Sequence, residues 1–195
     1  MALQNNVLNI PEAIWELFGG GDETQWNEIA SWLNAGGYII DQNQLGRSYP
    51  AGALAPSAGL ALNVGSGFPR WTFPANVTSS LYLNFGVPGW WNSLRLGYDL
   101  VNDGANGNIK FLYTLKGCNA GQAVAAASTF YTASPLEPAP VTGVHSTLLI
   151  ADPISITHGP FGTLWSLELT RLGGDVSDTA GDIGIEEIVV TLGTA

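Results

Sequence analysis

The chain has 195 residues, of which 46% are hydrophobic and only 11% charged, and its formal net charge is −10 at pH 7. This length fits one main domain with a sizeable core, which needs no disulfide or metal for stability. The excess of acidic over basic residues and the lack of any run of Lys or Arg argue against nucleic-acid binding. Because Cys118 is the only cysteine, an intrachain disulfide and a multi-cysteine zinc site are excluded.

Residues 1–37 have the pattern of two short helices, NIPEAIWELF and DETQWNEIASWLN, which end at glycines. Neither helix is long enough to be stable alone, so each must dock on another surface. Trp15, Trp26 and Trp32 concentrate docking surface in this predicted anchor region. They pack either on the chain's own β domain or on a neighbouring subunit, and the composition does not separate the two. The start of the chain lacks the pattern of a signal peptide, and no segment has the length of a membrane span, which predicts synthesis in the cytoplasm.

Residues 38–67 are rich in Gly, Ala and Pro and are predicted to form a linker or extended arm. From residue 68 to 195 apolar and polar residues alternate in short runs, as in half-buried strands. Turn sequences separate these runs, and no helical pattern intervenes. We therefore predict an all-β fold, a jelly-roll-like antiparallel β-sandwich with a short helical N-terminal region. The predicted strands cover residues 81–87, 94–100, 109–115, 123–132, 143–150, 153–158, 165–169 and 183–192.

The last predicted strand changes its alternation part-way. Its apolar positions are Ile183 and Ile185, and then Ile188, Val190 and Leu192. One extra residue at Glu186-Glu187 would keep both halves facing the core. This pattern predicts a β-bulge there and gives the two glutamates a structural role.

The stretch RLGGDVSDTAGD places Asp175, Asp178 and Asp182 close together. The spacing does not match an EF-hand loop. The three carboxylates could still gather around a calcium ion from an irregular loop. A glycoside hydrolase would need two acids across a cleft; Asp178 and Glu168 could take these roles, as could almost any two acids of an acidic protein. We favour a third interpretation, a hairpin-type connection in which the Asp side chains accept hydrogen bonds from backbone N–H groups and Arg171 pairs with one of them.

Trp90 and Trp91 follow Val-Pro-Gly in a predicted loop. Exposed indole rings there would form a platform on which sugar rings stack. The alternative is that they cover the end of the sandwich or are buried at a subunit contact.

Several of these elements together resemble a β domain of tailed-bacteriophage virion proteins. The resemblance lies in WTFPANVTSSLYLNFGVPGWWNSLRLGYDL, GNIKFLYTL and LWSLELTRLGGDVSDTAGDIGIEEIVV, and covers about residues 68–192. Its closing motif consists of Leu167, Leu169, Arg171, Asp178, Thr179, Gly181 and Asp182. In such sequences an aromatic residue often follows the Asp-Thr pair, where this chain has Ala180. The motif is architectural, so the resemblance implies no catalytic residue.

The resemblance implies a non-enzymatic structural protein located in the virion, with a capsid decoration (cement) or head-fibre role. Its partners would be the major capsid protein or another virion protein, and further copies of itself in a homotrimer. We expect no cofactor, no nucleic acid and no membrane. The alternative is a tail-fibre, receptor-binding or carbohydrate-binding module that binds a host-surface glycan through its exposed tryptophans.

Overall fold

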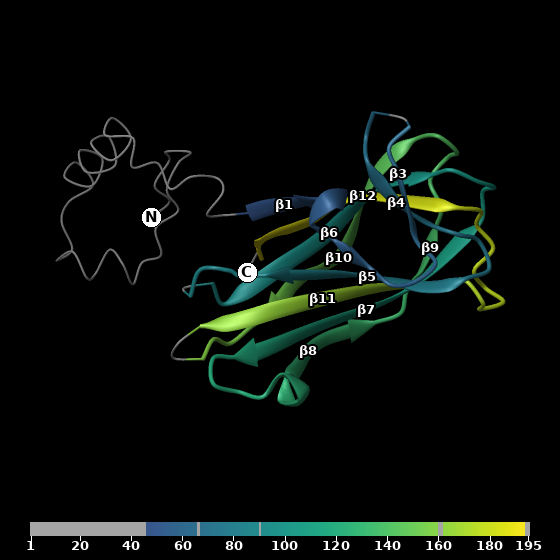
Figure 1. The fold of residues 1–195 in the computed structure, drawn as a ribbon. Coiled ribbons are helices and arrows are strands. Elements are labelled where there is room, and N and C mark those ends of the chain that lie inside the picture. The colour runs from purple at the N-terminus through teal and green to yellow at the C-terminus, as the bar shows by residue number, and fades with distance from the viewer. Residues whose placement is uncertain (1–45, 66, 90, 160–161, 194–195) are drawn as a thin grey trace, which may run out of the picture. The chain divides into compact units, whose positions relative to one another are not determined.

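The computed structural model describes residues 46–65, 67–89, 91–159 and 162–193 (Figure 1). The chain divides into two units, Met1–Leu45 and Gly46–Ala195. The predicted helical region and its three tryptophans, Trp15, Trp26 and Trp32, lie outside the described residues. In the part of the chain that the structure describes, no helix has the length and hydropathy needed to span a membrane.

The second unit is a sandwich of two antiparallel sheets, as the alternating pattern predicts (Figure 1). Sheet A has the strand order β10-β6-β12-β4-β3, and β1 also pairs with β12. Its strands are β1 (Gly46–Pro50), β3 (Ala61–Asn63), β4 (Arg70–Phe73), β6 (Ser93–Asn102), β10 (His145–Ser155) and β12 (Ile183–Leu192).

Sheet B has the order β2-β5-β11-β7-β8, and β9 also pairs with β7. Its strands are β2 (Ala55–Pro56), β5 (Thr78–Phe85), β7 (Asn108–Asn119), β8 (Ser128–Ala133), β9 (Leu136–Pro138) and β11 (Thr163–Leu172). The only described helical segments are two short 3-10 turns, η1 (Ala51–Ala53) and η2 (Val124–Ala126). The prediction of an all-β antiparallel sandwich is therefore confirmed.

The core lies between the two sheets and contains the apolar half of each alternating run. In β5, for example, Leu81, Leu83 and Phe85 are buried while Tyr82 and Asn84 are exposed. This side-chain period of two is what a sheet with one buried face requires.

Two tyrosines bring polar groups into the core. The hydroxyls of Tyr98 in β6 and Tyr113 in β7 lie 2.9 Å apart and share a hydrogen bond between the sheets. Burial raises the pKa of Tyr98 well above its usual value, and the neighbouring Tyr113 raises it further. Burial is also the main reason why the pKa of Tyr113 is raised. Both phenols therefore stay neutral, and each hydroxyl is the hydrogen-bond partner of the other.

The predicted boundary of the β domain at residue 68 is too late. Residues 46–50 form β1, which pairs along β12 from Gly46–Thr191 to Pro50–Glu187. The short strands β2 and β3 also lie in the predicted linker, next to β5 and β4. These segments join the sheets through backbone hydrogen bonds, and they are too short to carry an alternating pattern that the sequence could reveal.

The predicted β-bulge in the last strand is confirmed. Ile185 pairs with Leu100, whereas Glu187 pairs with Asp99, so one extra residue of β12 is inserted between them. The runs 143–150 and 153–158, predicted as two strands, form the single strand β10 instead. Its pairing with β6 has register shifts between Leu149 and Ala151 and between Ala151 and Ile154. These irregularities break the alternation, and the sequence pattern therefore reads as two strands.

Candidate functional site

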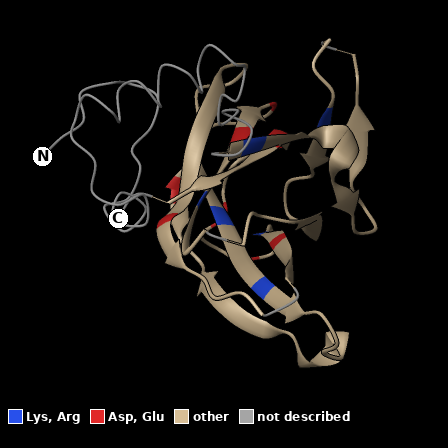
Figure 2. Ribbon diagram, turned by 90° about the vertical axis from the view of Figure 1, so that its left-hand side faces the viewer, with Lys and Arg blue, Asp and Glu red and all other residues tan. Residues whose placement is uncertain are grey.

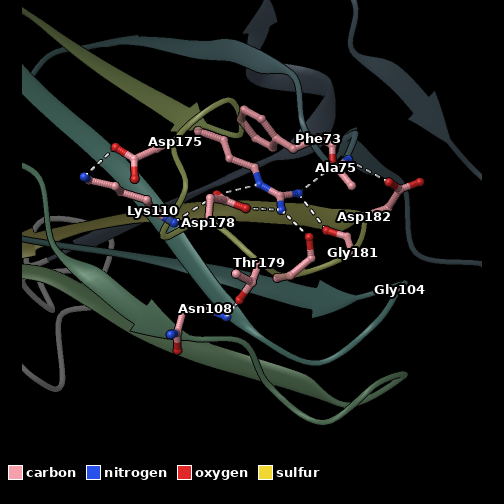
Figure 3. Close-up of polar contacts among 12 residues, drawn as sticks. Phe73, Ala75, Gly104, Asn108, Lys110, Asp175, Asp178, Thr179, Gly181 and Asp182 are labelled. Atoms are coloured by element: carbon pink, nitrogen blue, oxygen red, sulfur yellow. Dashed lines mark hydrogen bonds and ion pairs between the residues drawn. The ribbon is translucent and has the colours of Figure 1, made fainter.

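The Asp-rich stretch surrounds a buried arginine. Arg171 is fully buried at the end of β11, and its Nε and Nη2 donate to the two carboxylate oxygens of Asp178 at 3.0 and 2.6 Å (Figure 3). Its remaining N–H groups donate to three backbone carbonyls, those of Phe73, Ala180 and Gly181, at 3.1, 2.7 and 2.7 Å. All five guanidinium donors are thereby used, so the charge is compensated and fully hydrogen-bonded.

Neighbouring contacts tie the same loop to β7 and to the end of β6. The backbone N–H of Lys110 donates to Asp178 Oδ2 at 3.0 Å, and that of Asn108 donates to Thr179 Oγ1 at 3.0 Å (Figure 3). Gly104 and Gly181 lie so close that a Cβ added to Gly181 would meet the Ala105 nitrogen at 2.3 Å and the Gly104 Cα at 2.6 Å. The motif Asp178-Thr179…Gly181 thus fastens the loop to the sandwich.

The three aspartates bind three different partners. Asp175 pairs with Lys110 Nζ at 2.7 Å, and this hydrogen bond, followed by those from Ser177, holds its pKa well below the usual value. Asp182 Oδ1 accepts from the Ala75 N–H at 2.8 Å. Among the described residues, no group of three or more His, Cys, Asp or Glu side chains is arranged to hold a metal ion. The structure therefore does not bring these three carboxylates together, as the calcium interpretation would require.

The predicted connection between the last two strands is correct in its contacts but wrong in its topology. Arg171 pairs with an aspartate, and the three Asp side chains accept from backbone N–H groups as expected. However, β11 belongs to sheet B and β12 to sheet A, so the loop crosses between sheets and is not a hairpin. Asp178 is also unsuited to pair with Glu168 as a hydrolase, because its buried carboxylate is fully engaged by Arg171 and Lys110.

Trp91 does not form an exposed platform. Its side chain is only 3% exposed and belongs to the core cluster. A turn in which the Trp91 N–H donates to the Pro88 carbonyl, and a hydrogen bond from His158 Nε2 to the Trp91 carbonyl at 2.9 Å, fix this position. The alternative interpretation holds for Trp91, which covers the end of the sandwich. Trp90 lies outside the described residues.

The outward face of sheet B carries a continuous set of mostly polar side chains, of which Ser80 and Thr170 are themselves buried. These side chains alternate with core residues and therefore point away from the core. We call this set the sheet B face, and it consists of Ser80, Tyr82, Asn84, Leu112, Thr114, Lys116, Ser166, Glu168 and Thr170.

Register places these side chains in cross-strand rows. Glu168 of β11 lies between Tyr82 of β5 and Thr114 of β7, and the next row along contains Asn84, Ser166 and Lys116. Such rows put hydroxyl, amide, carboxylate and ammonium groups of three strands on one surface, with the Cβ atoms of opposite residues about 5 Å apart.

Hydrogen bonds fix the centre of this face. The Tyr82 hydroxyl donates to Glu168 Oε1 at 3.2 Å, and Thr170 Oγ1 lies 3.4 Å from the same oxygen. Ser80 and Thr170 share a hydrogen bond of 2.7 Å. Tyr82 nevertheless keeps 37% of its surface exposed. The face therefore presents an aromatic ring held beside a carboxylate. The Oε2 atom of this carboxylate accepts no hydrogen bond from the described residues and can accept one from a ligand.

The sheet B face carries little net charge. Its one acid, Glu168, is balanced by its one base, Lys116. The outward side of sheet A differs, because Asp99, Glu186 and Glu187 gather there. Figure 2 shows how sparse charged positions are over the described residues. A neutral, hydrogen-bonding surface is suited to an uncharged polar ligand.

The sequence alone does not point to this face, because neither an acidic cluster nor a tryptophan marks it. The signal was nevertheless present in SLYLNF and WSLELT, whose polar positions carry Tyr82, Asn84 and Glu168. What the sequence does not show is that β5 and β11 are direct neighbours, because 79 residues separate their facing segments.

Comparison of the structure with solved structures identifies the fold. The chain is similar to the Arthrobacter globiformis T6 isomalto-dextranase complexed with panose, with a TM-score of 0.54 and 16% identity over 75% of the chain. The chain has a jelly-roll β-sandwich fold. A second similar structure is the CBM22-2 xylan-binding domain from Paenibacillus barcinonensis Xyn10C, with a TM-score of 0.50 and 9% identity, covering 75% of this chain and 98% of that domain.

The two matches differ in extent. The jelly-roll chain spans nearly the whole xylan-binding domain but only 23% of the isomalto-dextranase. No protein-family model and no curated protein sequence matches the chain. At these identities the similarity defines the fold, and the function has to be argued from the side chains.

Proposed function

We propose that this chain is a non-catalytic module that binds an uncharged glycan across the sheet B face. The observation that carries the proposal is the hydrogen-bonded Tyr82–Glu168 pair, which holds an exposed aromatic ring and a carboxylate side by side on a nearly neutral sheet surface. An aromatic ring packs against the C–H face of a sugar, and a carboxylate accepts from its hydroxyls.

The surroundings of this pair supply further donors and acceptors in register. Asn84 and Ser166 lie in the adjacent cross-strand row, and Thr114 lies opposite Glu168. Oligosaccharides offer hydroxyls at regular intervals, which a row of short polar side chains on a rigid sheet is able to meet. The fold agrees with such a role, since one structurally similar domain is named for binding xylan. The proposed ligand class for this chain is thus a neutral oligosaccharide.

The proposal is tested by glycan binding with matched variants. The chain is first applied to an array of neutral and acidic oligosaccharides, and affinity for the best ligand is measured by calorimetry. Losing a hydrogen bond to a charged group costs about 1.5–3 kcal/mol, so Glu168→Gln should weaken binding by roughly tenfold or more. Tyr82→Ala removes the ring on which the sugar packs and should also weaken binding.

The control is Thr147→Ala, on β10 of the opposite sheet, and it should bind like the original protein. Circular dichroism and thermal melts confirm that each variant folds. Equal affinity of Tyr82→Ala, Glu168→Gln and the original chain would reject the sheet B face as the site. Failure to bind any glycan would reject the function itself.

A virion location is a second proposal. It is supported by the resemblance over residues 68–192 and by the division of the chain, which gives the β-sandwich a separate N-terminal unit. All six Lys and Arg residues lie after residue 45, while six of the 16 acids precede it. An acidic, tryptophan-bearing segment is suited to dock on a basic partner surface, as in a capsid or fibre. Mass spectrometry of purified particles, with copy number per particle, tests this proposal; absence of the chain from particles would reject it.

A further inference from the structure

The bulge in β12 concentrates carboxylates on the outward side of sheet A. Because one extra residue is inserted, Glu186 and Glu187 both lie opposite Asp99 of β6. Asp99 points outward, since its neighbours Tyr98 and Leu100 are core residues. Like charges placed directly opposite on neighbouring strands destabilise a sheet. This group of three acids therefore needs a compensating cation.

Of the three acids, Asp99 is the one with a buried carboxylate oxygen that accepts no hydrogen bond from the described residues. This oxygen is Oδ1, and Asp99 as a whole is only 9% exposed. Glu187 is better placed, because the Ser48 hydroxyl donates to it. A nearly buried carboxylate oxygen without a donor is costly unless a positive charge lies close by.

His145 is the side chain that faces this group. It is the first residue of β10, the edge strand of sheet A. Its Nδ1 lies 2.6 Å from Glu186 Oε2, and its Nε2 lies 3.4 Å from Asp99 Oδ2. Each ring nitrogen faces a carboxylate oxygen, so each needs a proton. Only the imidazolium form has two N–H donors, and the geometry therefore selects the charged ring.

The other charged groups on this side of sheet A form pairs of their own. Arg95 Nε lies 3.7 Å from Asp152, and Arg70 makes a two-point contact with Asp103 at 2.8 and 2.9 Å. The hydrogen bond to Glu186 is the main cause that raises the pKa of His145, while partial burial opposes it and the charges of Asp99, Glu186 and Glu187 add to it.

We propose that His145, Glu186 and Asp99 form a proton-dependent clamp that holds the start of edge strand β10 against β6 and β12. When the ring is charged, it joins three strands by bridging two carboxylates. When the ring is neutral, one bridge is lost and three carboxylates face one another. The bulge thus has a second role besides keeping the core face in register, because it brings Glu186 into reach of His145.

The sign of the pH effect follows from the raised pKa. A histidine whose pKa is higher in the folded state stabilises that state fully below its ordinary value of 6.5. This stabilisation is lost as the pH rises through the raised folded-state pKa. We therefore expect the start of β10 to loosen as the pH rises above 6.5 and through the raised pKa of His145.

The first test is a proton NMR titration of the His145 ring, assigned with the His145→Gln variant. The midpoint in the full chain should lie above 6.5. It should fall toward 6.5 in Glu186→Gln, and a smaller decrease is expected in Asp99→Asn. Glu168→Gln, the same change on the opposite sheet, serves as the control and should leave the midpoint unchanged. A midpoint at or below 6.5, or one that Glu186→Gln does not move, would overturn the clamp.

The second test separates a clamp from an isolated ion pair. Amide hydrogen exchange, corrected for the intrinsic pH dependence, is measured across β10 and across β7 as an internal reference. Protection at residues 146–149 should fall as the pH passes the His145 midpoint, and in His145→Gln it should be low at every pH. Protection that stays constant through the titration would show that His145 does not hold the strand, whatever its pKa.

Discussion

The guanidinium of Arg171 and the carboxylate of Asp178 form a fully buried two-point ion pair, with N–O separations of 3.0 and 2.6 Å. The pair joins the end of β11 to the loop that crosses to the other sheet. Removing one partner of a buried pair leaves an uncompensated charge, which costs far more than the pair contributes as a whole.

Asp178→Asn should therefore destabilise the fold by about 3–5 kcal/mol, measured by urea denaturation. Asp175→Asn, three residues away, is the matched control. Asp175 binds Lys110 at the surface, where screening by solvent makes an ion pair weak, so the loss of stability should be much smaller. Similar losses for the two variants would contradict the structural role assigned to the buried pair.

The close approach of two backbone segments at Gly181 leads to a second prediction. A Cβ at this position would meet backbone atoms of Gly104 and Ala105 at 2.3–2.7 Å. Gly181→Ala must push the loop away and should lower the thermal midpoint by several degrees, because even 1 kcal/mol shifts it by roughly 2–8 °C.

Gly174 in the same loop supplies the comparison. The nearest atom to an added Cβ there is Thr78 Oγ1 at 3.8 Å, an ordinary contact. Gly174→Ala should leave the midpoint nearly unchanged. If both variants melted alike, the close approach at Gly181 would be wrong.

Trp91 should matter for stability and not for a sugar contact. Because the indole is buried in the core, Trp91→Ala should cost about 3–5 kcal/mol. Phe68→Ala removes another aromatic ring from a loop, but one that is 69% exposed, and should cost roughly 0.5 kcal/mol or less. Denaturation curves decide between them; a fully stable Trp91→Ala that had lost glycan binding would restore the tryptophan platform.

The effects of Tyr98 and Tyr113 substitutions on the free energy of unfolding should be strongly coupled. Tyr98→Phe leaves the buried Tyr113 hydroxyl without its partner and should cost about 1–3 kcal/mol. The double variant Tyr98→Phe/Tyr113→Phe removes both polar groups, so its cost should be well below the sum of the single changes. A double-mutant cycle by denaturation measures this coupling, and additive costs would show that the two hydroxyls do not depend on each other.

The sequence predicts the parts of this fold that depend on side-chain periodicity. Alternation locates β5, β6, β7 and β11, and the change of parity at Glu186 locates the bulge. The pairing of Arg171 with one of the nearby aspartates is also predictable, because the two groups are close in the sequence.

The sequence does not predict features that depend on long-range pairing. The strand β1 is held by backbone bonds to β12, about 140 residues further along the chain. The candidate site is of the same kind, because Tyr82 and Glu168 meet only through the pairing of β5 with β11. The orientation of Trp91 depends on tertiary packing, which a loop pattern does not encode.

The most direct test of the central proposal is an NMR map of ligand contacts. A neutral oligosaccharide that binds the chain is titrated into the labelled protein, and the shifts of backbone amides are followed. The account predicts that the perturbed amides cluster on β5, β11 and β7 around Tyr82, Glu168 and Thr114, with saturable shifts. Perturbations confined to sheet A or to the loops at the ends of the sandwich would contradict it.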